Sequence, residues 1–255
     1  MDRARSVCDT EALMPVTLKK QTVLVVGASS GIGRAIAIQL AREGATVMAS
    51  ARRQDRLEEL QEELAEENIE IAISIADASN PAAMEELAAR TVEQFEKIDI
   101  LVYASGTNTP DRWLPRLSTK TWDDVIGVNL NGAYYATRAV LPAMRERKSG
   151  HLIYIASISA IVPDMSGAAY QASKRGMAGL AHAIRVEEKE NGIRTCVVCP
   201  GLVDTEILEK RPVKPPPEMI AKAMQSDDVA EAVLFVAKLP PRAAVPEIQI
   251  LPTEL

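Results

Sequence analysis

A tyrosine and a lysine, Tyr170 and Lys174, stand four residues apart in a segment with helical periodicity. Residues with this spacing share one face of a helix, so we expect the phenol and the ammonium to be neighbours. A free phenol has a pKa of about 10, and a nearby ammonium favours the phenolate. Lowering that pKa by about three units requires about 4 kcal/mol, which only a desolvated pocket supplies. The pair predicts proton exchange with a substrate oxygen, although this spacing alone more often means a half-buried ring beside a solvated charge.

Two other polar residues are placed to join this chemistry. Ser157 follows the apolar run 153–156 and precedes Tyr170 by 13 residues, so its hydroxyl is expected to hydrogen-bond the same substrate oxygen. Asn129 lies in a segment expected to form one long helix over about 121–147. An amide inside a helix also bonds readily to the backbone, so a catalytic and a purely structural interpretation of Asn129 both stay open.

A glycine cluster, Gly27-Ala28-Ser29-Ser30-Gly31-Ile32-Gly33, joins the first expected strand to the first expected helix. Glycines allow a sharp turn and let a pyrophosphate approach the helix N-terminus, whose free N–H groups and dipole favour anions. The spacing is G-x-x-x-G-x-G and not the G-x-G-x-x-G of two-lobed dehydrogenases. In a strand–loop–helix context it predicts a dinucleotide site, and the alternative is a glycine-rich turn without a ligand.

The end of the second expected strand indicates which dinucleotide is bound. An NAD site usually places an acid there for the ribose hydroxyls, whereas this chain has Ala51-Arg52-Arg53. A guanidinium suits a 2′-phosphate because it is planar and forms paired, charge-assisted hydrogen bonds. The sequence therefore predicts NADP(H), with Arg52 as the phosphate ligand and Arg53 as part of a solvated helix start.

Apolar runs alternate with helical segments along the chain. We expect strands at 22–26, 45–50, 69–75, 99–104, 151–156, 193–199 and 247–251, and helices at 32–43, 53–67, 81–97, 121–147, 167–190, 217–224 and 227–238. Continuous apolar strands separated by helices indicate a parallel sheet covered on both faces. The fold class predicted is α/β, a single-domain Rossmann-type doubly wound sheet of about seven strands with its ligand at their carboxyl ends.

Composition limits the possible functions. The 255 residues carry a formal net charge of −6, which argues against a nucleic-acid surface, and no apolar run is long enough to cross a membrane. Three cysteines give no disulfide framework and favour the cytoplasm. No metal site is expected, because His151 and His182 are far apart and Cys196 and Cys199 point to opposite faces of a strand. We expect an N-terminal tail at 1–20, one catalytic domain at 21–255, and within it a substrate loop at about 205–225.

Together these features make the chain resemble the short-chain dehydrogenase/reductase family in its compact single-domain branch. The resemblance runs from about Thr22 to the C-terminus. It rests on the glycine loop, Asn129, Ser157, Tyr170 and Lys174, and on Asp77, Tyr103-Ala104-Ser105-Gly106 and Pro200-Gly201-Leu202-Val203-Asp204-Thr205, all in the family's order.

The resemblance assigns a role to each of these residues. It implies that Tyr170 is the acid/base, that Ser157 orients the carbonyl, and that Asn129 holds a water in a proton relay. It implies that Lys174 binds the nicotinamide ribose and lowers the pKa of Tyr170. By the same resemblance Asp77 binds the adenine, and Val203 and Thr205 bind the carboxamide. The predicted cofactor-binding residues are Gly27, Ser29, Ser30, Gly31, Ile32, Gly33, Arg52, Asp77, Ala78, Ser105, Gly106, Tyr170, Lys174, Pro200, Gly201, Val203 and Thr205. The family also implies a homo-oligomer, a tetramer or a dimer.

Two motifs depart from the family pattern: Val26 replaces the usual threonine before the first glycine, and Tyr103-Ala104-Ser105-Gly106 replaces Asn-Asn-Ala-Gly. The second departure leaves the packing near Asn129 open.

The segments 227–233 and 246–248 are similar to those of NADP-dependent hydroxy-acid and serine dehydrogenases, and the Asp-Gly-Gly ending of many ketoacyl reductases is missing. We therefore expect a small carbonyl or secondary alcohol, specifically a 3-hydroxy acid or a β-hydroxy amino acid. The alternatives are a carrier-protein ketoreductase and a non-catalytic NADP(H) sensor. An apolar pocket wall is expected from Trp113, Ile158, Val162, Pro163, Met165 and Ile207. The loop with Lys210, Arg211 and Lys214 has the charge to attract a carboxylate, but three cations near prolines are more often solvated, so both interpretations stay open.

Overall fold

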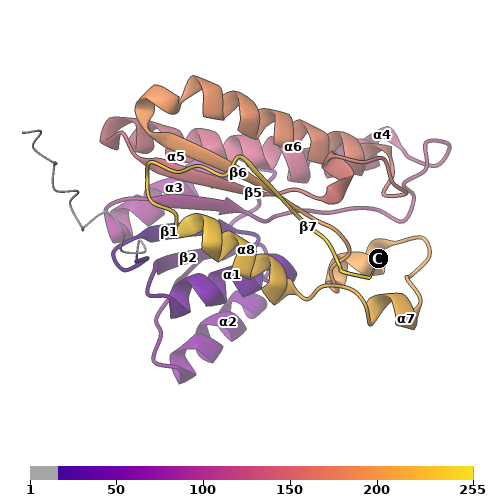
Figure 1. Cartoon of the computed structure of the whole chain (residues 1–255), viewed down its shortest axis with the longest axis horizontal. Helices are drawn as coiled ribbons and strands as arrows, with labels where there is room; N and C mark the ends of the chain where they lie inside the picture. Colours follow the sequence, from indigo (N-terminus) through magenta and orange to yellow (C-terminus); the bar gives the residue numbers. More distant parts are fainter. Residues whose placement is uncertain (1–16, 255) are drawn as a thin grey trace, which may run out of the picture.

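The computed structural model describes residues 17–254, which form a seven-stranded sheet between two layers of helices (Figure 1). The strands are β1 (Thr22–Val26), β2 (Thr46–Ala51), β3 (Ala72–Ile75), β4 (Ile100–Tyr103), β5 (Gly150–Ile155), β6 (Ile193–Pro200) and β7 (Glu247–Ile250). All neighbours pair in parallel, in the order β3-β2-β1-β4-β5-β6-β7. The strand order reverses between β1 and β4, and such a switch point opens a crevice at the carboxyl ends.

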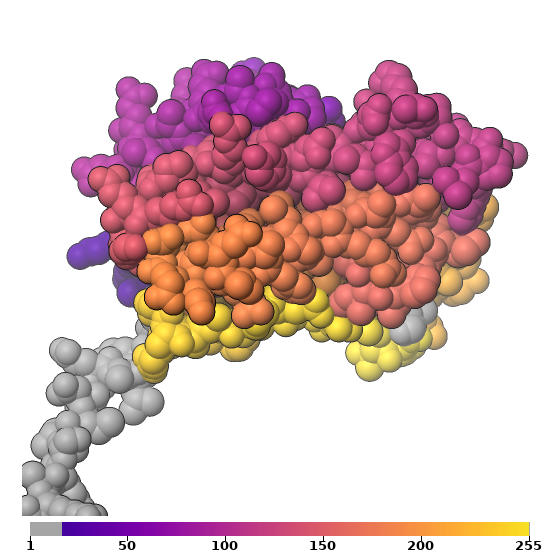
Figure 2. Space-filling model, turned by 90° about the horizontal axis from the view of Figure 1, so that it is seen from above, coloured from indigo at the N-terminus to yellow at the C-terminus, as the bar shows by residue number. Residues whose placement is uncertain are grey.

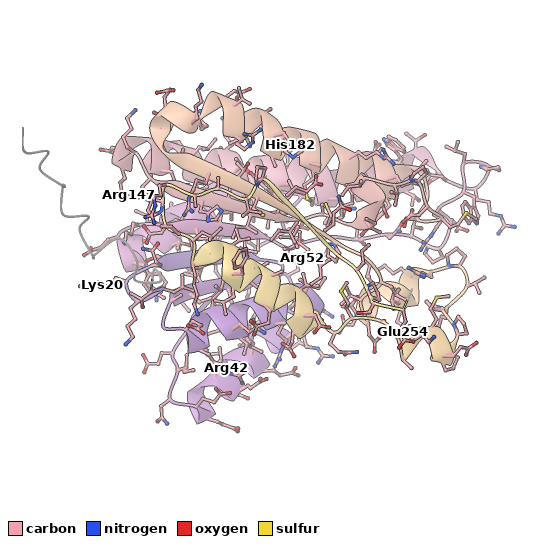
Figure 3. All side chains as sticks on the ribbon, in the orientation of Figure 1. Lys20, Arg42, Arg52, Arg147, His182 and Glu254 are labelled. Carbon is pink, nitrogen blue, oxygen red and sulfur yellow. The ribbon has the colours of Figure 1, made fainter. Side chains whose placement is uncertain are left out.

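The helices cover both faces of this sheet. They are α1 (Gly31–Arg42), α2 (Gln54–Glu66), α3 (Pro81–Phe95), α4 (Thr119–Ile126), α5 (Gly132–Arg147), α6 (Ala168–Glu187), α7 (Pro217–Ile220) and α8 (Ser226–Ala237), with shorter turns η2 (Gly127–Asn131), η3 (Ile158–Ala160), η4 (Lys189–Asn191) and η5 (Glu206–Lys210). Helices α1, α2 and α8 lie on one face and α3, α5 and α6 on the other (Figure 1). Figure 3 accordingly places Arg42 of α1 and His182 of α6 on opposite sides of the sheet. Figure 2 views the second layer from outside, with α5 between α3 and α6.

Two hydrophobic cores result, one on each face of the sheet. Val23 and Val25 of β1 belong to the core beneath α1 and α8, and Leu24 and Val26 to the core beneath α3 and α5. Side chains alternate between the faces of a strand, so a strand covered on both faces must be apolar at every position. Cys196 and Cys199 of β6 also fall in opposite cores, so they cannot close on one metal ion.

The structure confirms the predicted fold class, including the seven parallel strands. Several boundaries differ. The third strand begins at Ala72 and not at residue 69, and the helix expected over 121–147 is broken by the π-helical turn η2. The helix expected over 167–190 ends at Glu187, and the one expected over 217–224 ends at Ile220. No helix within residues 17–254 is long and apolar enough to cross a membrane.

The N-terminal boundary of the packed chain also lies earlier than predicted. Leu18 is only 1% exposed and belongs to a hydrophobic core, so packing begins before Gln21. The rest of the predicted tail, residues 1–16, lies outside the described residues. Residues 205–225, the predicted substrate loop, contain η5 and α7 and border the carboxyl ends of the strands (Figure 1).

Candidate active site

A cleft of about 690 Å³ lies at the carboxyl ends of the strands. Its walls come from the glycine loop, the ends of β2, β4, β5 and β6, and the start of the 205–225 loop. All of the predicted cofactor-binding residues line it, and so does Ser157. Asn129 is fully buried behind the wall. The topology thus gathers residues between Val26 and Arg211 around one cavity.

The glycine loop is held close to the backbone that follows β4. A Cβ on Gly27 would lie 2.5 Å from Ser105 N, and a Cβ on Gly33 would lie 2.1 Å from Gly27 O. Gly27 and Gly31 also have positive φ angles of 98° and 54°. Glycine is required here both for the turn and for the close backbone approach. The tight packing exposes the N-terminus of α1 to the cleft, and Ser30 does not cap it with its side chain, so its N–H groups remain free for an anion.

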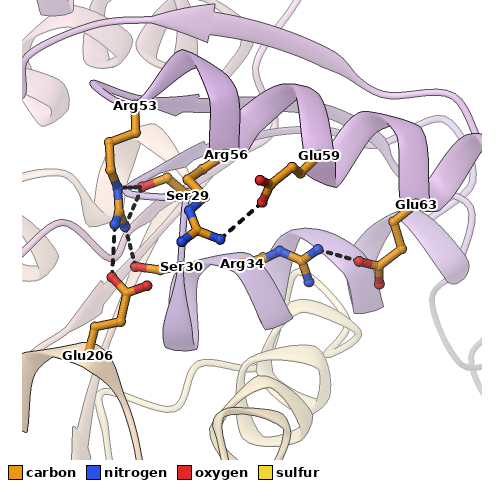
Figure 4. Close-up of polar contacts among 8 residues, drawn as sticks. All are labelled: Ser29, Ser30, Arg34, Arg53, Arg56, Glu59, Glu63 and Glu206. Carbon is orange, nitrogen blue, oxygen red and sulfur yellow. Dashed lines mark hydrogen bonds and ion pairs between the residues drawn. The ribbon is translucent and has the colours of Figure 1, made fainter.

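Arg53 contacts this loop directly, which corrects the interpretation of it as a solvated residue. Its Nη2 donates hydrogen bonds to Ser30 Oγ at 2.6 Å and to Ser29 Oγ at 3.1 Å, and its Nη1 lies 2.9 Å from Glu206 Oε2 (Figure 4). Arg52, the predicted phosphate ligand, has a side chain that is 68% exposed and an Nη1 3.9 Å from Asp77 Oδ2. Both guanidinium groups therefore stand at the end of β2, and Arg53 is the one bonded to the loop serines.

Other arginines near this end of the cleft are engaged elsewhere. Figure 4 shows Arg34 of α1 paired with Glu63 and Arg56 of α2 paired with Glu59. The first pair joins α1 to α2 and the second lies along α2, and neither arginine lines the cleft. Arg52 and Arg53 are therefore the arginines at the end of β2 that line the cleft.

Asp77 follows β3 and stays ionised. Burial by itself would raise the pKa of this carboxyl, but two hydrogen bonds from Ser79 and the charge of Arg52 outweigh it and lower the pKa below its usual value. Ser79 donates both its backbone N–H and its hydroxyl to Asp77 Oδ1, at 2.9 and 2.8 Å. The other oxygen, Oδ2, lies 3.9 Å from Arg52 Nη1, beyond hydrogen-bond distance.

Helix α6 brings Tyr170 and Lys174 to the opposite end of the cleft. Lys174 is 4% exposed, its Nζ donates a 2.8 Å hydrogen bond to Ile155 O, and the same atom lies 5.7 Å from the centre of the Tyr170 ring. Burial lowers the pKa of Lys174 to about 8. A Cβ on Gly106 would stand 3.4 Å from this Nζ, so the glycine leaves the ammonium accessible from the cleft.

The phenol of Tyr170 is tuned differently from the sequence prediction. Burial raises its pKa above the usual value; the Ser157 hydroxyl acts against this rise through a hydrogen bond, and Arg211 and Arg112 do so through their charge. The expected lowering by Lys174 is wrong for the protein alone, because desolvation of the ring outweighs every favourable charge near it. At neutral pH the phenol therefore carries its proton and is ready to donate it.

Ser157 lies at the head of a hydrogen-bonded chain. Its Oγ accepts from Ser159 N at 3.2 Å and donates to Ser159 Oγ at 3.1 Å. Ser159 donates in turn to Asp164, which also accepts from the hydroxyl and the backbone N–H of Ser166. These bonds fix the rotamer of Ser157 beside Tyr170, as a residue that orients a substrate oxygen requires.

Asn129 sits in the π-helical turn and clamps the segment after β4. Its Oδ1 accepts from Thr107 N at 2.7 Å, and its Nδ2 donates to Thr107 O and to Ser173 Oγ, both at 3.0 Å. The side chain thus bonds backbone, as one interpretation of the sequence held, but the backbone belongs to a distant loop. π-helical turns of this kind often occur at functional sites.

Comparison with known proteins places the chain in a family. The family described as short chain dehydrogenase matches residues 21–215, which is most of the chain. The chain belongs to the short-chain dehydrogenase family. An uncharacterized oxidoreductase of Staphylococcus saprophyticus is 32% identical over 239 residues, covering 93% of this chain and 99% of the relative.

Solved structures of this family match along nearly the whole chain. An alcohol dehydrogenase from the archaeon Thermococcus sibiricus, complexed with 5-hydroxy-NADP, is 29% identical with a TM-score of 0.82, covering 92% of this chain and 97% of that one. The closed form of serine dehydrogenase complexed with NADP+ is 33% identical with a TM-score of 0.82, covering 90% and 94%. The relation to hydroxy-acid and serine dehydrogenases expected from the sequence fits this second match.

The structure also accounts for the departures from the family's usual motifs. The Tyr103 hydroxyl, where the family has an asparagine, donates to Val128 O inside the π-helical turn. A Cβ on Gly132 would lie 2.2 Å from that hydroxyl oxygen, so the larger side chain fits because position 132 is a glycine. Tyr103 therefore supports the turn that carries Asn129. Val26 is buried in the core beneath α3 and α5.

The substrate end of the cleft is more polar than the sequence predicted for this short-chain dehydrogenase. Of the six residues expected to form an apolar wall, only Ile158 and Ile207 line the cleft. Trp113, Val162 and Met165 instead have exposed side chains. The polar residues that do line it and that sequence reasoning missed include Arg112, Ser159, Asp164 and Ser166. They lie in loops or, for Ser159, in the short turn η3, where no periodicity distinguishes a cleft residue from a solvated one.

Proposed function

We propose that this short-chain dehydrogenase is an NADP(H)-dependent oxidoreductase that acts on a small carbonyl or secondary alcohol, specifically a 3-hydroxy acid or a β-hydroxy amino acid. The observation that carries the proposal is that one cleft contains a set of phosphate-binding residues at one end and a set of acid/base residues at the other. Arg52, Arg53 and the glycine loop form a phosphate-binding end, and Ser157, Tyr170 and Lys174 form an acid/base end. Nothing in this arrangement requires a metal ion, and residues 17–254 contain no cluster of metal-ligating side chains.

The residues present fit a dinucleotide with a 2′-phosphate. The glycine loop forms a cradle that a Cβ would fill, and the N-terminus of α1 opens on it. No acid stands at the end of β2, where an NAD site would need one for the ribose hydroxyls, and two guanidinium groups take that place. Asp77 would hold the adenine, Lys174 the nicotinamide ribose, and Val203 and Thr205 the carboxamide. Similar structures solved with NADP+ or 5-hydroxy-NADP support this choice.

The chain's own residues transfer the proton to or from the substrate oxygen. When bound, the nicotinamide supplies or accepts the hydride. In the reducing direction Tyr170 donates its phenolic proton to the carbonyl oxygen, and the Ser157 hydroxyl holds that oxygen beside the phenol. Because burial keeps the pKa of Tyr170 high, the resting phenol is protonated, which suits a proton donor. Lys174 stabilises the phenolate left behind, and Asn129 holds the segment at Thr107 beneath the site.

One substitution tests the proposal against its alternatives. Tyr170→Phe is expected to bind NADPH as the wild type does and to lose at least about 100-fold in turnover with a panel of carbonyl compounds, since general acid catalysis contributes about 10²–10⁴-fold. Tyr134→Phe, at an exposed tyrosine of α5, is the matched control and should keep full activity. Unchanged turnover in Tyr170→Phe refutes the proposed role. NADPH binding without any turnover in the wild type would favour a non-catalytic sensor.

Further parts of the proposal concern whether the substrate is free or bound to a carrier protein, the oligomeric state, and the cellular compartment. A carrier-protein ketoreductase is the second candidate for the substrate, and parallel assays with free oxo acids and with acyl thioesters discriminate between them. We also propose a homo-oligomer, a tetramer or a dimer, in the cytoplasm. Sedimentation velocity of the full chain measures the assembly directly, and a monomer at micromolar concentration would contradict that part.

A further inference from the structure

Arg112 is a buried charge without a counter-charge. It is 5% exposed and lies in the loop after β4. Its Nε donates to Thr109 O at 3.1 Å and its Nη2 to Lys210 O at 2.7 Å, both neutral acceptors. Within residues 17–254 it forms no ion pair. Burying a cation is costly unless a partner of opposite charge compensates, so an unpaired guanidinium needs a physical reason.

The other buried charged residues have such a reason. Glu188, 4% exposed, is paired with Arg145. Lys174 likewise bonds only to a carbonyl oxygen, but its ammonium serves the acid/base end of the cleft. Of these three, Arg112 alone has a charge that neither the fold nor the proposed proton transfer uses.

The free part of the Arg112 guanidinium opens on the cleft. Its Nη1 has no acceptor among the described residues, yet it is not sealed from solvent as the ring nitrogens of His151 are. Arg112 lines the same cavity as Tyr170, Ser157 and Arg211. The positive charges of Arg112 and Arg211 both act on the Tyr170 phenol and on each other. A site with two mutually repelling cations is completed by an anion.

Asp164, the acid lining this cavity whose charge acts on Arg112, does not supply that anion. Asp164 lies near enough to influence Arg112 electrostatically but forms no ion pair with it, and its carboxylate is held by Ser159 and Ser166. The anion must therefore come with the ligand. A guanidinium forms charge-assisted hydrogen bonds with a carboxylate, and a carboxylate is the anionic group that the proposed 3-hydroxy acid and β-hydroxy amino acid substrates carry.

We propose that Arg112, assisted by Arg211, binds the carboxylate of the substrate, so that the enzyme selects oxo and hydroxy acids over neutral carbonyl compounds. This inference rests on the proposed function and adds to it the residue that recognises the carboxylate of the substrate. It also opposes the carrier-protein alternative, since an acyl thioester presents no carboxylate to Arg112.

The fold holds the Arg112 side chain rigidly for this task. Gly167, at the start of α6, has a φ of 92°, and a Cβ there would lie 2.5 Å from Arg112 Cβ. The glycine thus lets Arg112 pack against the beginning of the helix that carries Tyr170. The bond to Lys210 O ties its other side to the 205–225 loop. The carboxylate site is therefore fixed relative to the proton donor, which is what a positioned substrate requires.

The test compares each acid with its methyl ester. A panel of short 3-oxo acids, such as acetoacetate against methyl acetoacetate, is assayed with NADPH in the wild type, Arg112→Gln and Arg112→Lys. We expect the wild type to prefer the acids and Arg112→Gln to lose about 10- to 100-fold in kcat/KM for acids, the range of a charge-assisted hydrogen bond. The esters should change less than about threefold. Arg112→Lys should recover only part of the preference, because an ammonium lacks the fork.

The acid-to-ester ratio separates binding from a purely structural role. If Arg112 only supported the loops, acids and esters would lose activity together and their ratio would stay constant, which overturns the inference. Arg116→Gln is the matched control, because Arg116 is exposed on the same segment and does not line the cleft. Should Arg112→Gln fail to fold, Arg211→Gln must lower the same ratio. A wild type that prefers no acid over its ester also overturns the inference.

A binding measurement tests the carboxylate site separately from the proposed oxidoreductase activity. Thermal shift of the NADPH-loaded protein is recorded with each acid and ester. Stabilisation by acids that disappears in Arg112→Gln supports the carboxylate site even if Tyr170→Phe turns out to retain turnover. Conversely, loss of turnover in Tyr170→Phe together with equal binding of acids and esters leaves the oxidoreductase standing and removes the carboxylate site.

Discussion

Removing the negative charge of Glu206 is expected to tighten the binding of NADPH. Glu206 Oε2 lies 2.9 Å from Arg53 Nη1, and Arg53 also bonds to Ser29 and Ser30 of the glycine loop (Figure 4). A 2′-phosphate at this end of the cleft must share Arg53 with Glu206 or displace it. In Glu206→Gln the guanidinium is freed and the repulsion between carboxylate and phosphate is removed.

The size of the effect follows from the exposure of the pair. The side chains of Arg53 and Glu206 are 43% and 54% exposed, and ion pairs this accessible are worth about 0.2–1 kcal/mol. Release of Arg53 should therefore lower the Kd for NADPH about 1.5- to 5-fold. The Kd for NADH, which has no 2′-phosphate, should change less. In 1 M salt the Debye length falls to about 3 Å, and the difference between variant and wild type should shrink.

The assay is a fluorescence titration of NADPH and NADH with the wild type and two variants. Glu209→Gln is the matched control, since Glu209 lies in the same turn but pairs with Lys214. Weaker NADPH binding in Glu206→Gln would show that Glu206 positions Arg53 for the phosphate and does not compete for it. Equal improvement for NADPH and NADH would show that the effect comes from the loop and not from the 2′-phosphate. Either result refutes the reasoning.

Two further predictions concern stability. Gly132→Ala should lower the free energy of unfolding by about 1–3 kcal/mol in urea titrations, because its Cβ would meet the Tyr103 hydroxyl at 2.2 Å, whereas Gly179→Ala, with nothing within 4 Å, should raise it by up to about 1 kcal/mol. Equal changes in the free energy of unfolding for Gly132→Ala and Gly179→Ala would contradict the packing described for the π-helical turn. Burial lowers the pKa of His151 from 6.5 to about 3. Between these two pH values the unfolded state binds a proton at His151 and the folded state does not. The free energy of unfolding should therefore fall as the pH drops below about 6.5, by up to about 1.4 kcal/mol per pH unit. His151→Leu should flatten that slope, with His182→Gln as the control for loss of a histidine; an unchanged slope in His151→Leu would assign it to other groups.

The features that the sequence revealed are those that constrain the backbone. Gly27 and Gly33 are required by contacts of their own backbone, and positions 23–26 of β1 are apolar because both faces of the strand are covered. Such requirements produce a fixed spacing of glycines or a run of apolar residues, and both can be recognised in the sequence without a structure. The fold class, the cofactor cleft and the positions of Ser157, Tyr170 and Lys174 could be predicted for this reason.

The features that the sequence did not reveal depend on distant partners. The π-helical turn arises where Tyr103 bonds to Val128 O and Asn129 clamps Thr107, and helical periodicity alone predicts one continuous helix. Arg53 looked solvated because its partners Ser29 and Ser30 lie more than 20 residues earlier in the chain. The pKa of Tyr170 was misjudged because the spacing of Tyr170 and Lys174 shows the ammonium but not the desolvation of the ring.

The two ends of the cleft are joined by one short turn, η5. At its start Glu206 pairs with Arg53 at the phosphate end, and at its end Lys210 accepts from Arg112 and donates to Thr107 at the substrate end. A phosphate that displaces Glu206 and a carboxylate that binds Arg112 therefore act on the same five residues from opposite sides. Because the turn is too short to absorb both changes independently, cofactor and acid should influence each other's affinity through it. Substitutions in η5 that touch neither ligand would then change both affinities together.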